Sequence, residues 1–154
     1  MRALRRLVLL GTLGVSVAFG GQAQAGASAV SCHAIDAHGL GQDLGGGITQ
    51  AQILGGGLLE GTTNGTFTVT GFSGTVASIA GTVEFTTNRA TLTATVTGTL
   101  DVASGAFEAS GPVTDGTGKL SGATGTLTFT GVEDLSTGSF TEQVSGSICA
   151  DLSP

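Results

Sequence analysis

One carboxyl group, that of Glu142, stands out as a side chain that could do chemistry inside this protein. In residues 140–148 it shares the parity of Phe140, Val144 and Ile148, and residues of one parity face one side of a strand. Glu142 is the one acidic residue that we expect to face inward. A carboxyl group among apolar side chains has a raised pKa and could protonate or polarise a ligand. The alternative is a bulge after Phe140 that turns Glu142 outward, because buried glutamate is rare unless it is paired.

Other reactive groups do not form a recognisable site. The only metal-like cluster combines imidazole and carboxyl groups, namely His33, Asp36, His38 and Asp43. No HxH or HxxxH spacing sits on a defined element, so we expect a solvated N-terminal segment and no metal. No serine or cysteine nucleophile has a histidine partner, since both histidines lie beside Cys32. We therefore predict no cofactor and no catalytic residue apart from the candidate Glu142.

The elements that must position these side chains are β-strands. In residues 91–102 threonines of one parity alternate with apolar residues of the other, the pattern of a strand with one wet and one buried face. Further strands are expected at residues 27–35, 66–70, 75–79 and 81–86, with Asn64 and Gly65 as a hairpin turn. The side chains that we expect to line the core or a cavity are Phe67, Phe85, Leu92, Val96, Phe107, Phe129 and Phe140.

An internal repeat supports a meander of hairpins. Residues 93–107 match residues 126–140 at an offset of 33, and each copy is a strand, a turn and a return strand that opens with phenylalanine. Asp101 and Asp134 occupy equivalent turn positions, where a carboxylate accepts hydrogen bonds from nearby backbone N–H groups. Gly105 and Gly138 fit the left-handed position that closes such a loop.

About eight antiparallel strands and no helix after residue 25 predict an all-β protein, either a closed barrel or a β-sandwich. We favour the barrel because closure removes exposed strand edges. The two cysteines, Cys32 and Cys149, lie near the ends of the chain. We expect a disulfide between them, which requires the first and last strands to be neighbours.

The N-terminus has the pattern of a secretory signal. Arg2, Arg5 and Arg6 precede a short apolar stretch, and residues 23–25 form an Ala-x-Ala site, so we expect cleavage after Ala25. Residues 26–154 then form a single β-barrel domain that is secreted, periplasmic or at the cell surface. We expect no membrane span after cleavage, because the apolar stretch is shorter than the ~20 residues of a spanning helix.

The charge of the processed chain excludes one class of partner. The 11 acidic residues would face only two basic ones, Arg89 and Lys119. Two separated cations cannot neutralise a phosphate backbone, so we expect no binding to nucleic acid.

Residues 111–125 carry a glycine motif, Gly116, Gly118, Gly122 and Gly125. A phosphate-binding loop is excluded, because Val113 and Leu120 stand where it needs a glycine and a hydroxyl residue. Residues 114–125 resemble the Gly-Gly-Thr-Gly-x-Phe-x-Gly-Ala-x-Gly pattern of allene oxide cyclase-like and dirigent-like proteins, with Asp115 in place of one glycine and Leu120 in place of the aromatic residue. The resemblance implies an eight-stranded barrel with a central cavity. No catalytic residue of that family aligns.

These observations favour an exported, non-catalytic barrel that binds a small apolar ligand or acts at the cell surface. Two alternatives stay open: an isomerase or cyclase that uses Glu142, and a structural or adhesive surface subunit. A central cavity would favour the first two interpretations, because an interior filled by phenylalanine side chains leaves no room for a ligand. The oligomeric state does not follow from the sequence.

Overall fold

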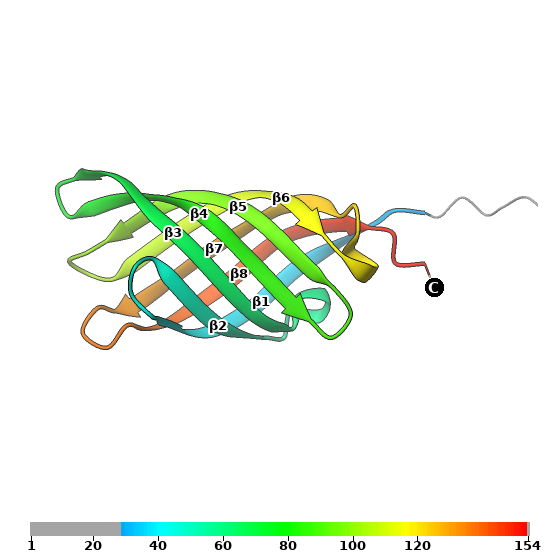
Figure 1. The fold of residues 1–154 in the computed structure, drawn as a ribbon, viewed down its shortest axis with the longest axis horizontal. Coiled ribbons are helices and arrows are strands. Elements are labelled where there is room, and N and C mark those ends of the chain that lie inside the picture. Colours follow the sequence, from blue (N-terminus) through cyan, green and yellow to red (C-terminus); the bar gives the residue numbers. More distant parts are fainter. Residues whose placement is uncertain (1–28, 154) are drawn as a thin grey trace, which may run out of the picture.

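Residues 29–153, which the computed structural model describes, form a closed barrel of eight antiparallel strands (Figure 1). Every strand pairs with the next one along the chain, and β8 pairs with β1 to close the ring. The barrel prediction is confirmed, and the alternative of a sandwich is wrong. The predicted signal segment lies outside the described residues. The elements are β1 Ser31–Asp43, β2 Ile48–Leu54, η1 Gly57–Leu59, β3 Gly61–Ser73, β4 Val76–Thr87, β5 Thr91–Asp101, β6 Ala106–Gly116, η2 Gly118–Leu120, β7 Thr124–Asp134 and β8 Ser139–Ala150.

A disulfide joins the two strands that close the barrel. Cys32 of β1 lies directly opposite Cys149 of β8, with a Cα–Cα distance of 3.9 Å, and the two sulfurs are bonded. The predicted disulfide is therefore confirmed, as is the neighbourhood of the first and last strands. Cys32 is exposed and Cys149 half-buried, so the bond lies on the outer face and fills no space in the core.

The alternation of the sequence determines which side chains fill the barrel. In β5 the side chains of Leu92, Ala94 and Val96 are buried, whereas Thr95 and Thr97 on the opposite face are exposed. Val102 continues the inward parity but is 44 % exposed, because β5 ends at Asp101 and the chain turns there. An eight-stranded barrel has an interior just wide enough for packed side chains or for one small ligand.

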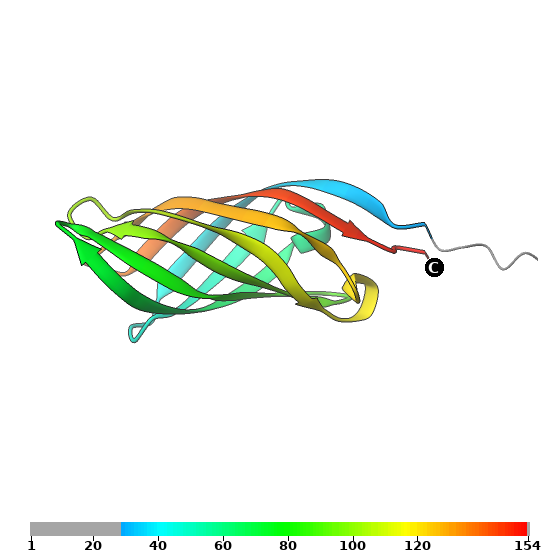
Figure 2. The same ribbon diagram turned by 90° about the horizontal axis from the view of Figure 1, so that it is seen from above.

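The barrel has two different ends. The turns β1–β2, β3–β4, β5–β6 and β7–β8 lie at one end, which we call the hairpin end, and both ends of the described chain lie at the other, the terminal end (Figures 1 and 2). The short helices η1 and η2 bring the buried side chains of Leu59 and Leu120 into the core next to the terminal end. No helix within residues 29–153 is long and apolar enough to cross a membrane.

The repeat forms two equivalent hairpins. The carboxylates of Asp101 and Asp134 accept hydrogen bonds of 2.9 Å from the backbone N–H groups of Ala103 and Ser136. Hydrogen bonds hold the pKa of both acids below its usual value, chiefly the Ala103 N–H for Asp101 and the Ser136 hydroxyl for Asp134. Gly105 and Gly138 have φ values of +75° and +73°. The turn prediction is confirmed.

Several predicted strand limits are wrong. Asn64 and Gly65 lie inside β3 and pair with β2 and β4. Gly65 faces inward beside the Phe67 ring, where a Cβ would lie 2.6 Å from the ring carbon Cε2. This glycine therefore provides space for an aromatic ring and forms no turn.

Two other strands are longer than the sequence predicted. The strand predicted at residues 27–35 begins at Ser31 and continues to Asp43, so residues 36–43 are paired strand and not a solvated segment. Residues 27 and 28 lie outside the described residues. The two strands predicted within residues 75–86 are one strand, β4. Neighbouring strands supply hydrogen bonds along the whole length of each of these segments, and local alternation does not reveal such long-range pairing.

Candidate ligand pocket

The interior contains a cavity of about 260 Å³ toward the hairpin end. Its lining is mostly apolar and comes from all eight strands, together with Gly47 from the β1–β2 turn. The main apolar side chains that line it are Phe67, Ile79, Val83, Phe107, Phe129 and Phe140. The interior is thus not filled completely by its phenylalanine residues.

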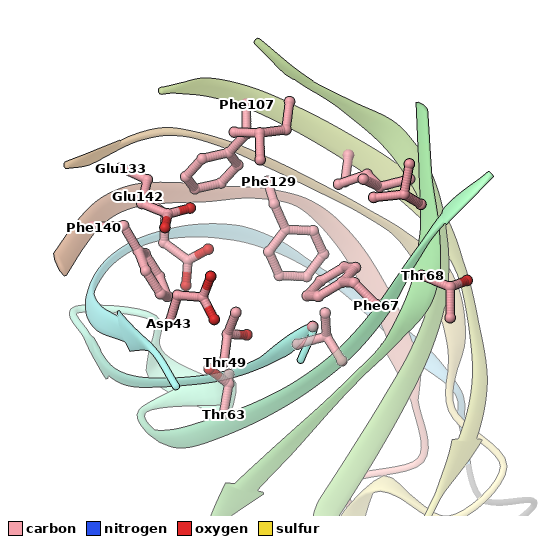
Figure 3. Close-up of a pocket in the computed structure, with 16 residues that line it drawn as sticks. Asp43, Thr49, Thr63, Phe67, Thr68, Phe107, Phe129, Glu133, Phe140 and Glu142 are labelled. Atoms are coloured by element: carbon pink, nitrogen blue, oxygen red, sulfur yellow. The ribbon is translucent and has the colours of Figure 1, made fainter. Parts of the chain in front are cut away.

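Three carboxyl groups lie on one side of this pocket. Figure 3 shows the carboxyl groups of Asp43, Glu133 and Glu142 near Phe140, with the Phe67 and Phe129 rings across the pocket. They come from β1, β7 and β8, which are adjacent in the closed barrel. The expectation that Glu142 is the only inward acid is therefore wrong. Asp43 and Glu133 lie at strand ends, where they reach the pocket at the hairpin end.

Glycines on neighbouring strands make room for the large pocket side chains. Gly39 of β1 lies opposite Glu142 of β8, and a Cβ on Gly39 would lie 2.5 Å from Cγ and Oε1 of Glu142. Gly41 lies opposite Phe140 in the same way, and its Cβ would overlap the Phe140 ring. The long side chains therefore lie along the barrel wall over backbone without a Cβ, and the centre stays open.

The Glu142 carboxyl group is largely, but not completely, removed from water. It forms no hydrogen bond or ion pair with residues 29–153. Burial raises its pKa from 4.5 to about 7, because the apolar surroundings disfavour the charged form. Glu142 is therefore a weak acid that gains or loses its proton near neutral pH.

Glu133 and Asp43 interact directly at the hairpin end. Partial burial raises the pKa of Glu133, and the negative charge of Asp43 and a hydrogen bond between the two side chains raise it further. When Glu133 is protonated, its O–H can donate to the Asp43 carboxylate. This side of the pocket favours a proton or another positive charge.

Two pairs of aromatic rings pack in and behind the pocket wall. Phe107 and Phe140 meet edge to face, with ring centroids 5.9 Å apart and an interplanar angle of 88°. Phe129 contacts the fully buried Phe85 ring behind it, with centroids 6.0 Å apart. All four rings belong to the residues predicted to line the core or a cavity. Leu92 and Val96, the remaining aliphatic members of that set, are buried in β5.

The Glu142→Gln variant is expected to change how stability depends on pH. Below about pH 4.5 the Glu142 carboxyl group is protonated in the folded and in the unfolded protein. As the pH rises toward 7, it loses its proton in the unfolded chain and keeps it in the folded one. The free energy of unfolding of the wild-type protein therefore falls between about pH 4.5 and pH 7. The decrease is on the order of 3 kcal/mol, because one pKa unit corresponds to about 1.36 kcal/mol. The variant lacks this loss, so its advantage in unfolding free energy should grow from pH 4.5 to pH 8. Urea denaturation at both pH values measures the difference.

The control for this experiment is Glu108→Gln, because Glu108 is an exposed acid on the outer face of β6. Its substitution should change stability little, and equally at both pH values. An advantage of Glu142→Gln that stays constant with pH would show that the carboxyl group is solvated and would contradict the pocket geometry.

The sequence-based metal candidates do not come together. His33 and Asp43 face inward near opposite ends of β1, whereas Asp36 and His38 face outward and are exposed. No group of residues within the described part of the chain has the arrangement of a metal site. The Asp36 side chain instead accepts a hydrogen bond from Gln143 on the neighbouring strand.

The glycine motif lies away from the pocket, at the end of β6, in the connection that follows and at the start of β7. Gly118 and Gly122 have φ values of +55° and +70° around η2, where other residues would be strained. Gly116 and Gly125 lie where a Cβ would overlap the backbone oxygens of Leu120 and Ser147. These glycines allow the chain to fold back over the terminal end and do not contact the pocket.

Fold and pocket together define a class: a closed eight-stranded antiparallel barrel with an apolar pocket and an acidic side. Comparisons of the chain with protein-family models, curated proteins and solved structures gave no match. The assignment of a function therefore depends on the pocket itself.

Proposed function

We propose that this protein is an exported, non-catalytic β-barrel that binds a small apolar ligand in the pocket at the hairpin end. The observation that carries the proposal is the cavity of about 260 Å³, which is lined mainly by phenylalanine and aliphatic side chains. Binding sites for small molecules are typically concave and apolar, with a few polar groups that orient the ligand. In this pocket the three carboxyl groups would orient the ligand.

Export is supported by two independent features. Residues 1–25 have the basic, apolar and Ala-x-Ala regions of a signal peptide. The disulfide between Cys32 and Cys149 is the kind of bond that persists in oxidising compartments. We infer a location in the periplasm, at the cell surface or in the medium.

A second candidate function is that of an isomerase or cyclase with Glu142 as its acid or base. Its support is the pKa of about 7, since a general acid–base group works best when its pKa is near the working pH. The resemblance of residues 114–125 to allene oxide cyclase-like proteins covers only the glycine framework and leaves the activity open. Once a ligand is known, Glu142→Gln should abolish turnover and retain binding if the protein is an enzyme.

The third interpretation, a structural or adhesive subunit, has less support. Such assemblies often add a strand to an exposed sheet edge. All eight strands of the described barrel have two neighbours, so none offers a free edge.

Introduced tryptophan can test ligand binding, because the protein has no Trp or Tyr of its own. Leu100→Trp places an indole at the pocket lining, and Leu54→Trp places one at an exposed site. Apolar ligands should shift the emission of the Leu100→Trp protein and leave that of the Leu54→Trp protein unchanged. Native mass spectrometry of the purified wild-type protein should reveal any bound small molecule. Absence of both an adduct and an emission shift would refute the proposed function.

A further inference from the structure

We propose that the ligand of this pocket is a cationic amphiphile, an organic ammonium ion with a short apolar tail. This inference rests on the proposed function and specifies the chemical class of the ligand. The apolar tail occupies the cavity between Phe67 and Phe129, and the ammonium group lies beside the carboxyl groups of Asp43, Glu133 and Glu142 (Figure 3).

The cavity itself provides the first argument. Its apolar and aromatic walls accept a hydrocarbon chain, and removal of that chain from water favours binding. The charged groups among its lining residues are all acidic, since no lysine, arginine or histidine of the described chain lines it. An anionic head group would find no countercharge there, whereas an ammonium ion would find three carboxyl groups.

The second argument is that two of these carboxyl groups have no positively charged partner within residues 29–153. Glu142 is largely desolvated and has no ion pair within residues 29–153, and Glu133 lies beside another acid. A bound cation would stabilise the charged form of both groups, because an opposite charge nearby favours ionisation. No lysine or arginine within residues 29–153 lines this pocket.

The distribution of charge over the barrel provides the third argument. Both basic residues of the described chain, Arg89 and Lys119, line a shallow hollow next to η1 and η2, away from the hairpin end. Asp101 and Asp134 in the hairpin turns add negative charge around the pocket end. A field of one sign attracts ligands of the opposite charge and speeds their association.

Aromatic rings complete the recognition of an ammonium group. The Phe140 ring lies next to the carboxyl groups and meets Phe107 edge to face. A cation over the face of a phenylalanine ring is attracted by the ring quadrupole, and the attraction is stronger in a desolvated site. The pocket therefore combines two features that bind organic cations, carboxylates and aromatic rings.

The test compares three ligands that have the same eight-carbon tail and different head groups: octylammonium, octanol and octyl sulfate. Calorimetric titration of the processed wild-type protein at pH 8 and low salt measures each affinity. We expect octylammonium to bind at least about tenfold more tightly than octanol, a difference of about 1.4 kcal/mol, and octyl sulfate to bind most weakly. Added salt should weaken the binding of octylammonium only.

Matched variants locate the charged groups responsible. Glu142→Gln and Glu133→Gln should each reduce octylammonium affinity by about tenfold and change octanol affinity much less. Glu108→Gln removes the same charge from the outer face of β6 and should have little effect. Circular dichroism confirms that each variant is folded, so a loss of affinity cannot come from unfolding.

The possible outcomes separate the two proposals. Equal binding of all three ligands, or tightest binding of octyl sulfate, would overturn the inference and leave apolar binding in place. If Glu108→Gln reduced octylammonium affinity as much as Glu142→Gln, the inference would also be overturned. The attraction would then come from the charge of the whole surface. Failure of all three ligands to bind would overturn the inference, and the tryptophan and mass-spectrometry experiments would then decide on apolar binding independently.

Discussion

Replacement of Cys32 and Cys149 by serine is expected to lower the free energy of unfolding by about 4–5 kcal/mol. The two residues are 117 positions apart in the sequence, so the disulfide closes a very long loop. In the chain-entropy account, this loop restricts the unfolded chain and thereby favours the folded state. The cysteines lie on the outer face, so their replacement leaves no cavity and isolates the effect of the cross-link. Equilibrium unfolding in urea measures the change.

Wild-type protein treated with a strong reductant provides the control. It should lose about the same stability as the double serine variant, and the reductant should not affect that variant. If the double variant were as stable as the oxidised wild type, the β1–β8 pairing alone would close the barrel and the cross-link would be energetically neutral.

Phe85→Ala is expected to destabilise the protein by about 3–5 kcal/mol, the usual range for loss of a buried phenylalanine. The Phe85 side chain is fully buried and packs against Phe129. The substitution removes apolar contact and leaves a cavity in a core where neighbouring strands cannot move closer. Denaturant titrations give the change in midpoint, and an unchanged slope would show that the same surface unfolds.

The matched control is Phe72→Ala, the same substitution at a ring that is 68 % exposed. It should change stability by no more than about 0.5 kcal/mol. Because Phe129 also lines the pocket, Phe85→Ala should weaken apolar ligand binding while Phe72→Ala should not. Similar losses of stability from both variants would mean that the barrel interior is not packed as described.

The pocket is more informative about function than the fold is. A closed barrel with a solid interior would favour a purely structural protein, whereas this barrel retains a cavity and gathers three acids along one wall. Glu142 is the common element of the binding and the catalytic hypotheses. Its substitution therefore discriminates among them: a loss of turnover indicates an enzyme, and a selective loss of cation binding indicates a receptor for organic ammonium ions.

The sequence alone predicted some local features of this barrel correctly. Alternation of threonine with apolar residues identified the buried side of β5, because successive side chains of an extended chain point to opposite faces. The repeated turns at Asp101 and Asp134 were predictable because their hydrogen bonds lie within a few residues. The cysteine pair also predicted the contact between the first and last strands. The parity of Phe129 and Glu133 in β7 was a further signal for a second inward acid.

Only the tertiary structure decided which residues meet across strands. Asn64 and Gly65 have the composition of a turn, but pairing with β2 and β4 holds them in a strand. Asp43 lies some 90 residues before Glu133 in the chain, and the closure of β8 onto β1 brings both acids to one pocket wall. Side-chain parity is a property of the local backbone, whereas register and closure depend on hydrogen bonds between distant segments. The strand faces were thus readable from the sequence, and the acidic pocket arises only when the ring of strands closes.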